Sequence, residues 1–224
     1  GMSVVDLQGV VVLLGRFPAL TGLDLTVSSG EMVLVEGANG AGKSTLLRLC
    51  AGLVAPTRGD ARVLGSDLFL ERRSVRRRVA LLNHATSLYD DLTVAENVEF
   101  WAKASGLRSS AEERTAWALT RLGLEPPLAD QPTRAVSAGQ RRRTSIAALA
   151  VRRPDLWLLD EPHAGLDQLG RRIVDDLMGE AVAAGGTVIF SSHESDQVRD
   201  LASRVVVLAG GTVLTDDVRT APNA

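Results

Sequence analysis

The chain has 224 residues, which is enough for one domain of ordinary size. Hydrophobic residues make up 45% and charged residues 23%, a globular composition that argues against disordered, collagenous and coiled-coil classes. The 25 basic and 27 acidic side chains leave a net charge of -2. A dedicated nucleic-acid binder needs an excess of positive charge, so no nucleic-acid partner is expected.

Neither a disulfide nor a membrane span is expected from the sequence. Cys50 is the single cysteine, and it lies in an apolar helical pattern where a small core residue is its more usual role. Residues 1–30 lack the pattern of a signal peptide, and no apolar run approaches the roughly 18 residues that cross a bilayer. If the protein works at a membrane, we therefore expect another chain to span it.

Strands are predicted towards both ends of the chain and helices in its middle. Runs rich in apolar and β-branched residues predict strands at 4–14, 23–27, 32–36, 79–82, 156–159, 187–190 and 205–208. Apolar residues at helical spacing predict a helix that follows residue 45 and ends before Pro56, two helices within 93–122, and one at 140–151. The later strands are mostly apolar, as expected for a parallel sheet that is covered on both faces.

A glycine-rich loop follows the strand predicted at 32–36. Gly37, Gly42, Lys43 and Ser44 match the pattern G-x-x-x-x-G-K-[ST], in which backbone N–H groups turn towards one anion. Lys43 is expected to reach the β and γ phosphates and Ser44 to hold Mg²⁺, at a helix N-terminus that itself attracts anions. A glycine-rich turn that binds nothing is the alternative, but the position between strand and helix favours a triphosphate site. The residues expected to contact the nucleotide are Gly37, Asn39, Gly40, Ala41, Gly42, Lys43, Ser44 and Thr45.

Two carboxylates follow the apolar strand predicted at 156–159. Asp160 is placed to bind Mg²⁺ through water, and Glu161 to orient or deprotonate an attacking water. A solvated strand end, with Pro162 starting a turn, is the alternative. The phosphate loop favours the catalytic interpretation, because phosphoryl transfer needs both a metal and an oriented nucleophile.

Three further segments resemble motifs of one known family. Residues 136–140, Val-Ser-Ala-Gly-Gln, resemble the signature sequence of ATP-binding-cassette (ABC) ATPases. Residues 164–167, Ala-Gly-Leu-Asp, are similar to the D-loop of that family, and His193 resembles its switch histidine. Together with the phosphate loop and the carboxylate strand, five motifs occur in the family's order.

This resemblance implies a fold and a domain organisation. The family fold is an α/β P-loop NTPase with a mostly parallel sheet, an N-terminal antiparallel β subdomain and an inserted α-helical subdomain. Residues 1–224 would form a single ABC ATPase domain, with its core at 1–83 and 152–224 and its helical subdomain at 84–151.

The same resemblance implies an ATP site that two subunits share. Two copies of the chain, or this chain and a related ABC subunit, would pair head to tail around two ATP molecules with Mg²⁺. The phosphate loop of one subunit would face Ser137 and Gly139 of the other, and Gln140 and Asp167 would contact the same nucleotide. His193 would contact the γ-phosphate and help to position the water; a hydrogen-bonded histidine at a strand end is the alternative.

The sequence departs from the family at residues expected to hold the metal and the adenine. His84 stands where most members carry a glutamine that helps to hold Mg²⁺, and imidazole is a poor ligand for a hard cation. We expect His84 to contact the metal only through water or to leave this role to another group; Asn83 is the weaker candidate, and a surface residue without a role is the alternative. Phe17 is the nearest aromatic that could stack on adenine, although alignment equally places Leu14 there.

The expected function is that of an ATP-hydrolysing subunit that powers a separate integral membrane transporter subunit. It would lie in the cytoplasm, peripheral to the inner face of the cell membrane. His84 and Ser-Ala-Gly-Gln in place of Ser-Gly-Gly-Gln resemble the ATPase of the heme exporter of cytochrome c maturation. The alternatives are a soluble ABC ATPase acting on DNA or ribosomes, or a nucleotide-binding regulator that does not hydrolyse ATP. Phe100 and Trp101 lie where the family forms its groove for the membrane partner, but they fit a helical core equally well.

Overall fold

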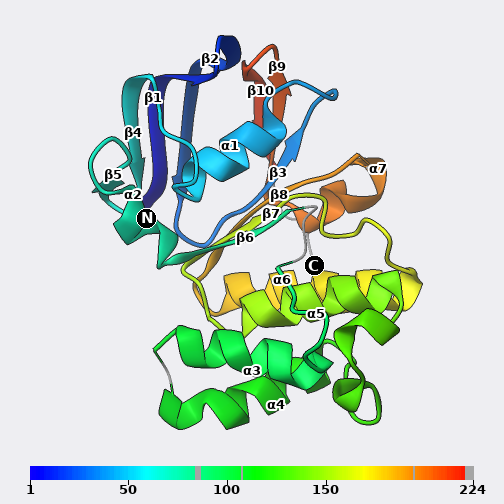
Figure 1. Cartoon of the computed structure of the whole chain (residues 1–224). Coiled ribbons are helices and arrows are strands. Elements are labelled where there is room, and N and C mark those ends of the chain that lie inside the picture. Colours follow the sequence, from blue (N-terminus) through cyan, green and yellow to red (C-terminus); the bar gives the residue numbers. More distant parts are fainter. Residues whose placement is uncertain (84–86, 107, 194, 220–224) are drawn as a thin grey trace. The chain divides into compact units, whose positions relative to one another are not determined.

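The computed structural model describes residues 1–83, 87–106, 108–193 and 195–219, and Figure 1 traces its elements along the chain. The chain divides into two compact units. The first unit holds Gly1–Leu81, Asp155–Pro162 and the chain from Gly179 onwards, and the second holds Leu82–Pro154 and His163–Met178. The organisation expected from the sequence, one domain with a helical subdomain at 84–151, stays a prediction.

A four-stranded antiparallel sheet opens the first unit. Its strand order is β2-β1-β4-β5, and β1 pairs with both β2 and β4. In the second half of β2, buried apolar residues alternate with exposed polar ones, as expected for a strand with one face on a core. The strands are β1 (Ser3–Leu14), β2 (Phe17–Ser28), β4 (Arg58–Val63) and β5 (Ser66–Asp67).

A six-stranded sheet follows, with the order β10-β9-β3-β8-β7-β6. Neighbouring strands from β9 through β7 run parallel, and β10 is antiparallel to β9. Every residue of β3, β7 and β8 is buried, which explains their continuous apolar sequences. This confirms the predicted mostly parallel sheet. The strands are β3 (Met32–Glu36), β6 (Val79–Leu82), β7 (Leu156–Leu159), β8 (Thr187–Ser191), β9 (Arg204–Ala209) and β10 (Thr212–Val218).

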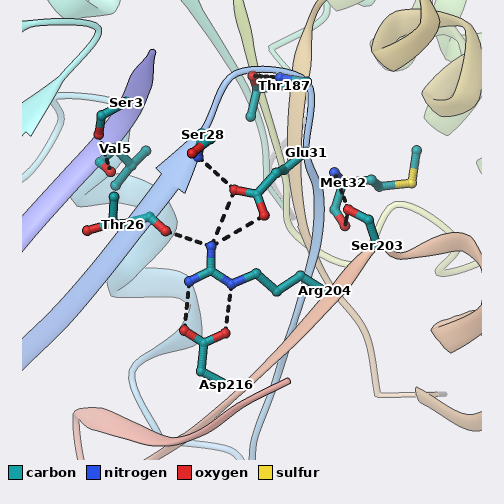
Figure 2. Close-up of polar contacts among 11 residues, drawn as sticks. Ser3, Val5, Thr26, Ser28, Glu31, Met32, Thr187, Ser203, Arg204 and Asp216 are labelled. Carbon is teal, nitrogen blue, oxygen red and sulfur yellow. Dashed lines mark hydrogen bonds and ion pairs between the residues drawn. The ribbon is translucent and has the colours of Figure 1, made fainter. Parts of the chain in front are cut away.

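Arg204, whose side chain is largely buried, joins the two sheets of the first unit through its guanidinium. Figure 2 shows its polar contacts. It donates two hydrogen bonds of 2.7 Å to Asp216 in β10 and one of 2.6 Å to the Thr26 carbonyl in β2. Glu31 adds longer contacts of 3.3 and 3.4 Å. The hydrogen bonds to Asp216 are the main cause that raises the pKa of Arg204, so its charge is retained at any pH at which the fold survives.

The helices of the first unit are short. α1 (Lys43–Cys50) buries Leu46, Leu47 and Leu49 in the same hydrophobic core as β1, β3 and β8. α2 (Arg72–Arg76) buries only Val75, and α7 (Ser195–Val198) is a single turn. None of the helices in the described residues has the length and hydropathy of a membrane span.

The second unit is helical. α3 (Val94–Ala104), α4 (Ala111–Arg121) and α5 (Ala138–Ala150) pack against one another, and α6 (Gln168–Ala183) begins in this unit. Thr93 and Glu96 form a capping box at the start of α3. Asn97, which is fully buried, bonds the backbone of Tyr89 and the side chain of Thr133. These bonds fix the loop that precedes α3.

Several elements were not predicted from the sequence, for identifiable reasons. In β4 only Ala61 and Val63 are buried, and β10 is an edge strand that is mostly exposed, so neither shows an apolar run. α2 carries one buried residue, and α6 is interrupted by glycines and charges. β2 begins earlier than expected because Pro18, which lacks an N–H, is tolerated on an edge strand.

Candidate active site

The predicted site residues of the first unit gather at one edge of the parallel sheet. β3 ends at Glu36 and leads into the phosphate loop, β7 ends at Leu159 before the two carboxylates, and β8 ends at Ser191 close to His193. Because parallel strands present their carboxyl ends at the same edge, residues that are distant in sequence meet there.

The phosphate loop requires glycine at two of its positions. A Cβ on Gly37 would lie 2.6 Å from the Leu208 carbonyl oxygen, and one on Gly42 would lie 2.9 Å from Leu20 Cδ2. Gly42 also has a φ of 109°, in the region that side chains disfavour. The motif glycines are therefore needed for the loop to pack against its neighbours, which the sequence pattern alone did not show.

Lys43 lies inside the phosphate loop. Its side chain is buried, and Nζ donates to the carbonyls of Gly37 and Ala38, the latter at 3.2 Å. α1 begins at Lys43, so the backbone N–H groups of Lys43, Ser44 and Thr45 belong to its first turn and have no acceptor within the helix. A buried ammonium beside N–H groups at a helix N-terminus is suited to bind an anion.

The carboxylate of Asp160 is held by two hydroxyl groups. Ser44 Oγ donates to Oδ2 at 2.8 Å, and Ser191 Oγ donates to Oδ1 at 2.6 Å. Asp160 is only 5% exposed. A carboxylate and a serine hydroxyl from two different elements thus converge, and oxygen is the donor type that Mg²⁺ prefers.

Glu161 is held in an unusual backbone conformation next to His193. Its φ is 51°, a region that costs a non-glycine residue about 1 kcal/mol or more. Its N–H donates to Ser191 Oγ at 3.0 Å, and its carboxylate Oε1 contacts His193 Nε2. His193 is half-exposed, whereas the Glu161 side chain is largely covered.

Four predicted residues belong to the second unit. Ser137 and Gln140 form a reciprocal capping box that begins α5, with bonds of 2.9 and 3.1 Å. A Cβ on Gly139 would lie 3.4 Å from the Gly165 carbonyl oxygen, so the signature sequence and the D-loop approach closely. Asp167 Oδ1 accepts from the Gly170 N–H at 2.8 Å, so Asp167 caps the start of α6. α5 starts two residues earlier than predicted because Ser137 is its cap.

The remaining predicted residues are less defined. His84 lies outside the described residues, and the neighbouring Asn83 uses its backbone carbonyl to accept from Arg142 at 2.7 Å. Phe17, at the start of β2, is 61% exposed. Trp101 stacks edge-on against Phe100, which is 42% exposed and also contacts Tyr89.

Sequence reasoning missed one polar residue that contacts the site and one that lies beside it in sequence. Ser191 bonds both Asp160 and the Glu161 backbone, and His163, between Pro162 and the D-loop, bonds Asp175. Ser191 is separated from Asp160 by 31 positions, so no local pattern points to the contact. For His163 the available signal was its place directly between two motifs.

Comparison with known proteins agrees with this geometry. The sequence profile of the family described as "ABC transporter" matches residues 20–164. The chain belongs to the ABC transporter family. The chain is 38% identical over 192 residues to the cytochrome c biogenesis ATP-binding export protein CcmA of Methylococcus capsulatus. This alignment covers 86% of the chain and 92% of CcmA. It is 37% identical over 213 residues to the daunorubicin/doxorubicin resistance ATP-binding protein DrrA of Streptomyces peucetius, covering 95% of the chain and 64% of DrrA.

Solved structures of ABC proteins have the same fold. An ATP-binding subunit of an ABC transporter superposes with a TM-score of 0.88 at 28% identity, covering 96% of the chain and 90% of that subunit. The cassette MJ0796, in a dimeric post-hydrolysis state bound to ADP and Pi, gives 0.88 at 25% identity, covering 98% of the chain and all (100%) of that cassette. The predicted fold class and the identification as an ATP-hydrolysing ABC subunit similar to CcmA are therefore confirmed.

Proposed function

We propose that this ABC ATPase hydrolyses ATP with Glu161 as general base, inside a dimer that drives a separate integral membrane subunit. The observation that carries the proposal is the convergence of five side chains at one edge of the parallel sheet. They come from α1, from the residues after β7 and from the end of β8. The five are Ser44, Asp160, Glu161, Ser191 and His193.

The phosphate loop would bind the ATP phosphates. Lys43 would turn its ammonium from the carbonyls of Gly37 and Ala38 to the β and γ phosphates, which supply a better acceptor. The first N–H groups of α1 would bind the same phosphates together with the backbone of Asn39, Gly40 and Ala41. Phe17 would stack on adenine. In its support, β2 passes beside the phosphate loop, since a Cβ placed on Gly42 would lie 3.0 Å from the carbonyl oxygen of Ala19, two residues further along the strand.

Ser44 and Asp160 fit a magnesium ion, because their oxygens already meet at 2.8 Å. When bound, Mg²⁺ supplies positive charge that neutralises the phosphates during phosphoryl transfer. Ser191 keeps the carboxylate of Asp160 oriented from the other side. His84 would take part only through water.

Glu161 would accept the proton of the attacking water. Its carboxylate is largely covered and lies in contact with His193 Nε2, which limits the directions that its oxygens can take. The same imidazole can turn to the γ-phosphate, since His193 is half-exposed. The left-handed backbone of Glu161 and its bond to Ser191 hold the residue in position for this step.

A second subunit would complete each ATP site. Ser137 and Gly139 at the N-terminus of α5, with Gln140 and Asp167, would contact the ATP bound by the other subunit, which is either a second copy or a related ABC chain. The exposed N-terminus of α5 carries partial positive charge that suits a γ-phosphate. The dimeric MJ0796 structure, at 25% identity, supports this arrangement.

The membrane subunit would choose the cargo. The relatives include proteins named for export, such as CcmA, and for methionine import, such as MetN of Caulobacter vibrioides at 39% identity over 209 residues, covering 90% of the chain and 62% of MetN. Related ATPases are therefore named for different cargoes. The likeness to CcmA over 92% of its length makes a heme exporter the first cargo class to test. The chain would act in the cytoplasm at the inner face of the cell membrane.

Isolation of the native complex tests this proposal. Tagged Glu161→Gln protein, which should bind ATP without hydrolysing it, is expressed in its native cell, and the chains that copurify from solubilised membranes are identified. Recovery of a multi-span membrane protein is the expected result. Recovery of ribosomal or DNA-bound proteins alone would contradict the transporter function and favour a soluble ABC ATPase.

A further inference from the structure

His163 is a buried polar residue of the second unit that the mechanism above does not use. Its side chain is 5% exposed, and Nε2 lies 2.5 Å from Oδ1 of Asp175 on α6. The carboxylate of Asp175 can only accept when ionised, so Nε2 carries the proton and His163 is the donor. A close, largely buried bond of this kind fixes the orientation of both groups.

The bond ties the residue before the D-loop to the helix that follows the D-loop. His163 precedes residues 164–167, and Asp175 lies two turns into the helix that follows them. At the other end of the same segment, Asp167 Oδ1 accepts from the Gly170 N–H at 2.8 Å. Between these two points the Leu166 N–H bonds the His163 carbonyl at 3.2 Å. The D-loop is therefore held to α6 both before and after its exposed residues.

The residues held in this way face solvent and the signature sequence. Ala164, Gly165 and Asp167 are exposed, whereas Leu166 is buried. The Gly165 carbonyl lies 3.4 Å from a Cβ placed on Gly139. A shift of the D-loop would therefore move the surface that, in the proposed dimer, meets the ATP bound by the second subunit. Displacement of a positioning group by about 1 Å can lower a rate by up to a hundredfold.

We propose that His163 is a positioning residue, which through Asp175 holds the D-loop in the conformation that closes the ATP-bound dimer. This inference rests on the proposed function, because it assigns His163 a part in dimer closure. It places His163 outside the nucleotide site of its own subunit. Its loss should therefore weaken dimer closure and turnover, but leave the binding of ATP to one subunit unchanged.

Four variants test the inference. His163→Ala and Asp175→Ala each remove the bond, His163→Gln keeps an amide donor that can reach Asp175, and the double alanine variant tests whether the two residues act together. Three quantities are measured for each: ATP affinity of the isolated subunit, the ATP-dependent dimerisation constant in the Glu161→Gln background, and kcat. Both single alanine variants should lower kcat and weaken dimerisation about tenfold.

The expected pattern distinguishes positioning from a general loss of stability. Subunit affinity for ATP should stay within about twofold, His163→Gln should recover most of the activity, and the double variant should be no worse than either single one. Thr115→Val is the control, because it removes another buried hydrogen bond of the second unit, from Thr115 Oγ1 to the Ala111 carbonyl at 2.7 Å. It should lower the unfolding temperature without lowering kcat at 25 °C, a standard assay temperature.

Several results would overturn the inference. Wild-type kcat and dimerisation in His163→Ala, equal losses in His163→Ala and His163→Gln, or a Thr115→Val variant with the same loss of kcat would each do so. The parent proteins are measured first. If the wild type does not hydrolyse ATP, or if Glu161→Gln does not dimerise with ATP, the proposed function fails and this inference fails with it; if both behave as proposed, a negative result concerns His163 alone.

Discussion

Ser191 shows how one hydroxyl group can contact both of the residues that follow β7. It donates to Asp160 at 2.6 Å and accepts from the backbone N–H of Glu161 at 3.0 Å. Ser191 is completely buried, so water cannot take the place of these hydrogen-bond partners. The residues of the phosphate loop and the carboxylate pair could be predicted because each lies in a short motif. Ser191 could not be predicted, because its partners follow a different strand, far away in the sequence.

Replacement of Ser191 by alanine should therefore lower kcat. Loss of the hydroxyl leaves Asp160 Oδ1 and the Glu161 N–H without this bond, and we expect kcat to fall about tenfold while ATP affinity changes little. Steady-state hydrolysis and equilibrium nucleotide binding provide the two measurements. Ser203→Ala is the control, since the Ser203 hydroxyl bonds the backbone of Met32 at the far end of β3. Equal kcat values in both variants and the wild type would refute the role of Ser191.

Cys50 gives a prediction for alkaline pH. Burial raises the pKa of its thiol to about 12, against about 8.5 in an unfolded chain. Between these values the unfolded chain releases the proton and the folded protein keeps it, so the free energy of unfolding falls by about 1.4 kcal/mol per pH unit as pH rises. Below about pH 8.5 the thiol adds no pH dependence.

Urea unfolding of the wild type and of Cys50→Ala from about pH 8 to about pH 10.5 measures this slope. Other groups titrate in both proteins, so the difference between the two profiles isolates the thiol. The wild type should lose stability more steeply than Cys50→Ala. Parallel profiles would show that the thiol titrates normally in the folded state.

Among the elements, the loop before α3 depends on one buried side chain. Asn97 Nδ2 donates to the Tyr89 carbonyl, the Thr93 carbonyl and Thr133 Oγ1 at 2.9, 3.1 and 2.7 Å, and its Oδ1 accepts from the Tyr89 N–H at 2.8 Å. The helix itself could be predicted from its apolar spacing. The role of Asn97 could not, because Thr133 lies 36 positions away.

Asn97→Ala should destabilise the protein by about 3 kcal/mol, because it removes the hydrogen bonds that a fully buried amide makes. Denaturant unfolding of the purified variant gives the value. Arg134→Ala is the comparison, since it breaks an exposed ion pair with Asp91 and should change stability by less than about 1 kcal/mol. Similar losses in the two variants would contradict the importance of burial.

Element prediction succeeded where apolar residues form an uninterrupted run, and failed where they do not. The strands β3, β6 and β7 have the expected bounds because their apolar runs coincide with burial. β10 and α6 have short or interrupted apolar patterns, and their place in the fold depends on pairing with β9 and on the cap at Asp167. These contacts are set by tertiary structure, which sequence periodicity does not report.

For the whole molecule, the two halves of the proposed ATP site belong to different units. The phosphate loop, Asp160, Glu161 and His193 lie in the first, and the signature sequence with Asp167 lies in the second. The resemblance to ABC ATPases predicted both halves and the dimer that would join them. Periodicity and composition predicted neither, because a surface that closes on a second subunit has no apolar pattern of its own.

The central claim is tested most directly by measuring ATP hydrolysis and ATP-dependent dimerisation together, on purified wild type and Glu161→Gln. The wild type should turn over ATP with Mg²⁺. Glu161→Gln should lose turnover by about a thousandfold, bind ATP as tightly as the wild type, and form a stable dimer only when ATP is present. Lys43→Ala, which removes the phosphate-binding ammonium, should neither bind ATP nor dimerise. Unchanged hydrolysis in Glu161→Gln would contradict the account, because the water would then be activated by another residue.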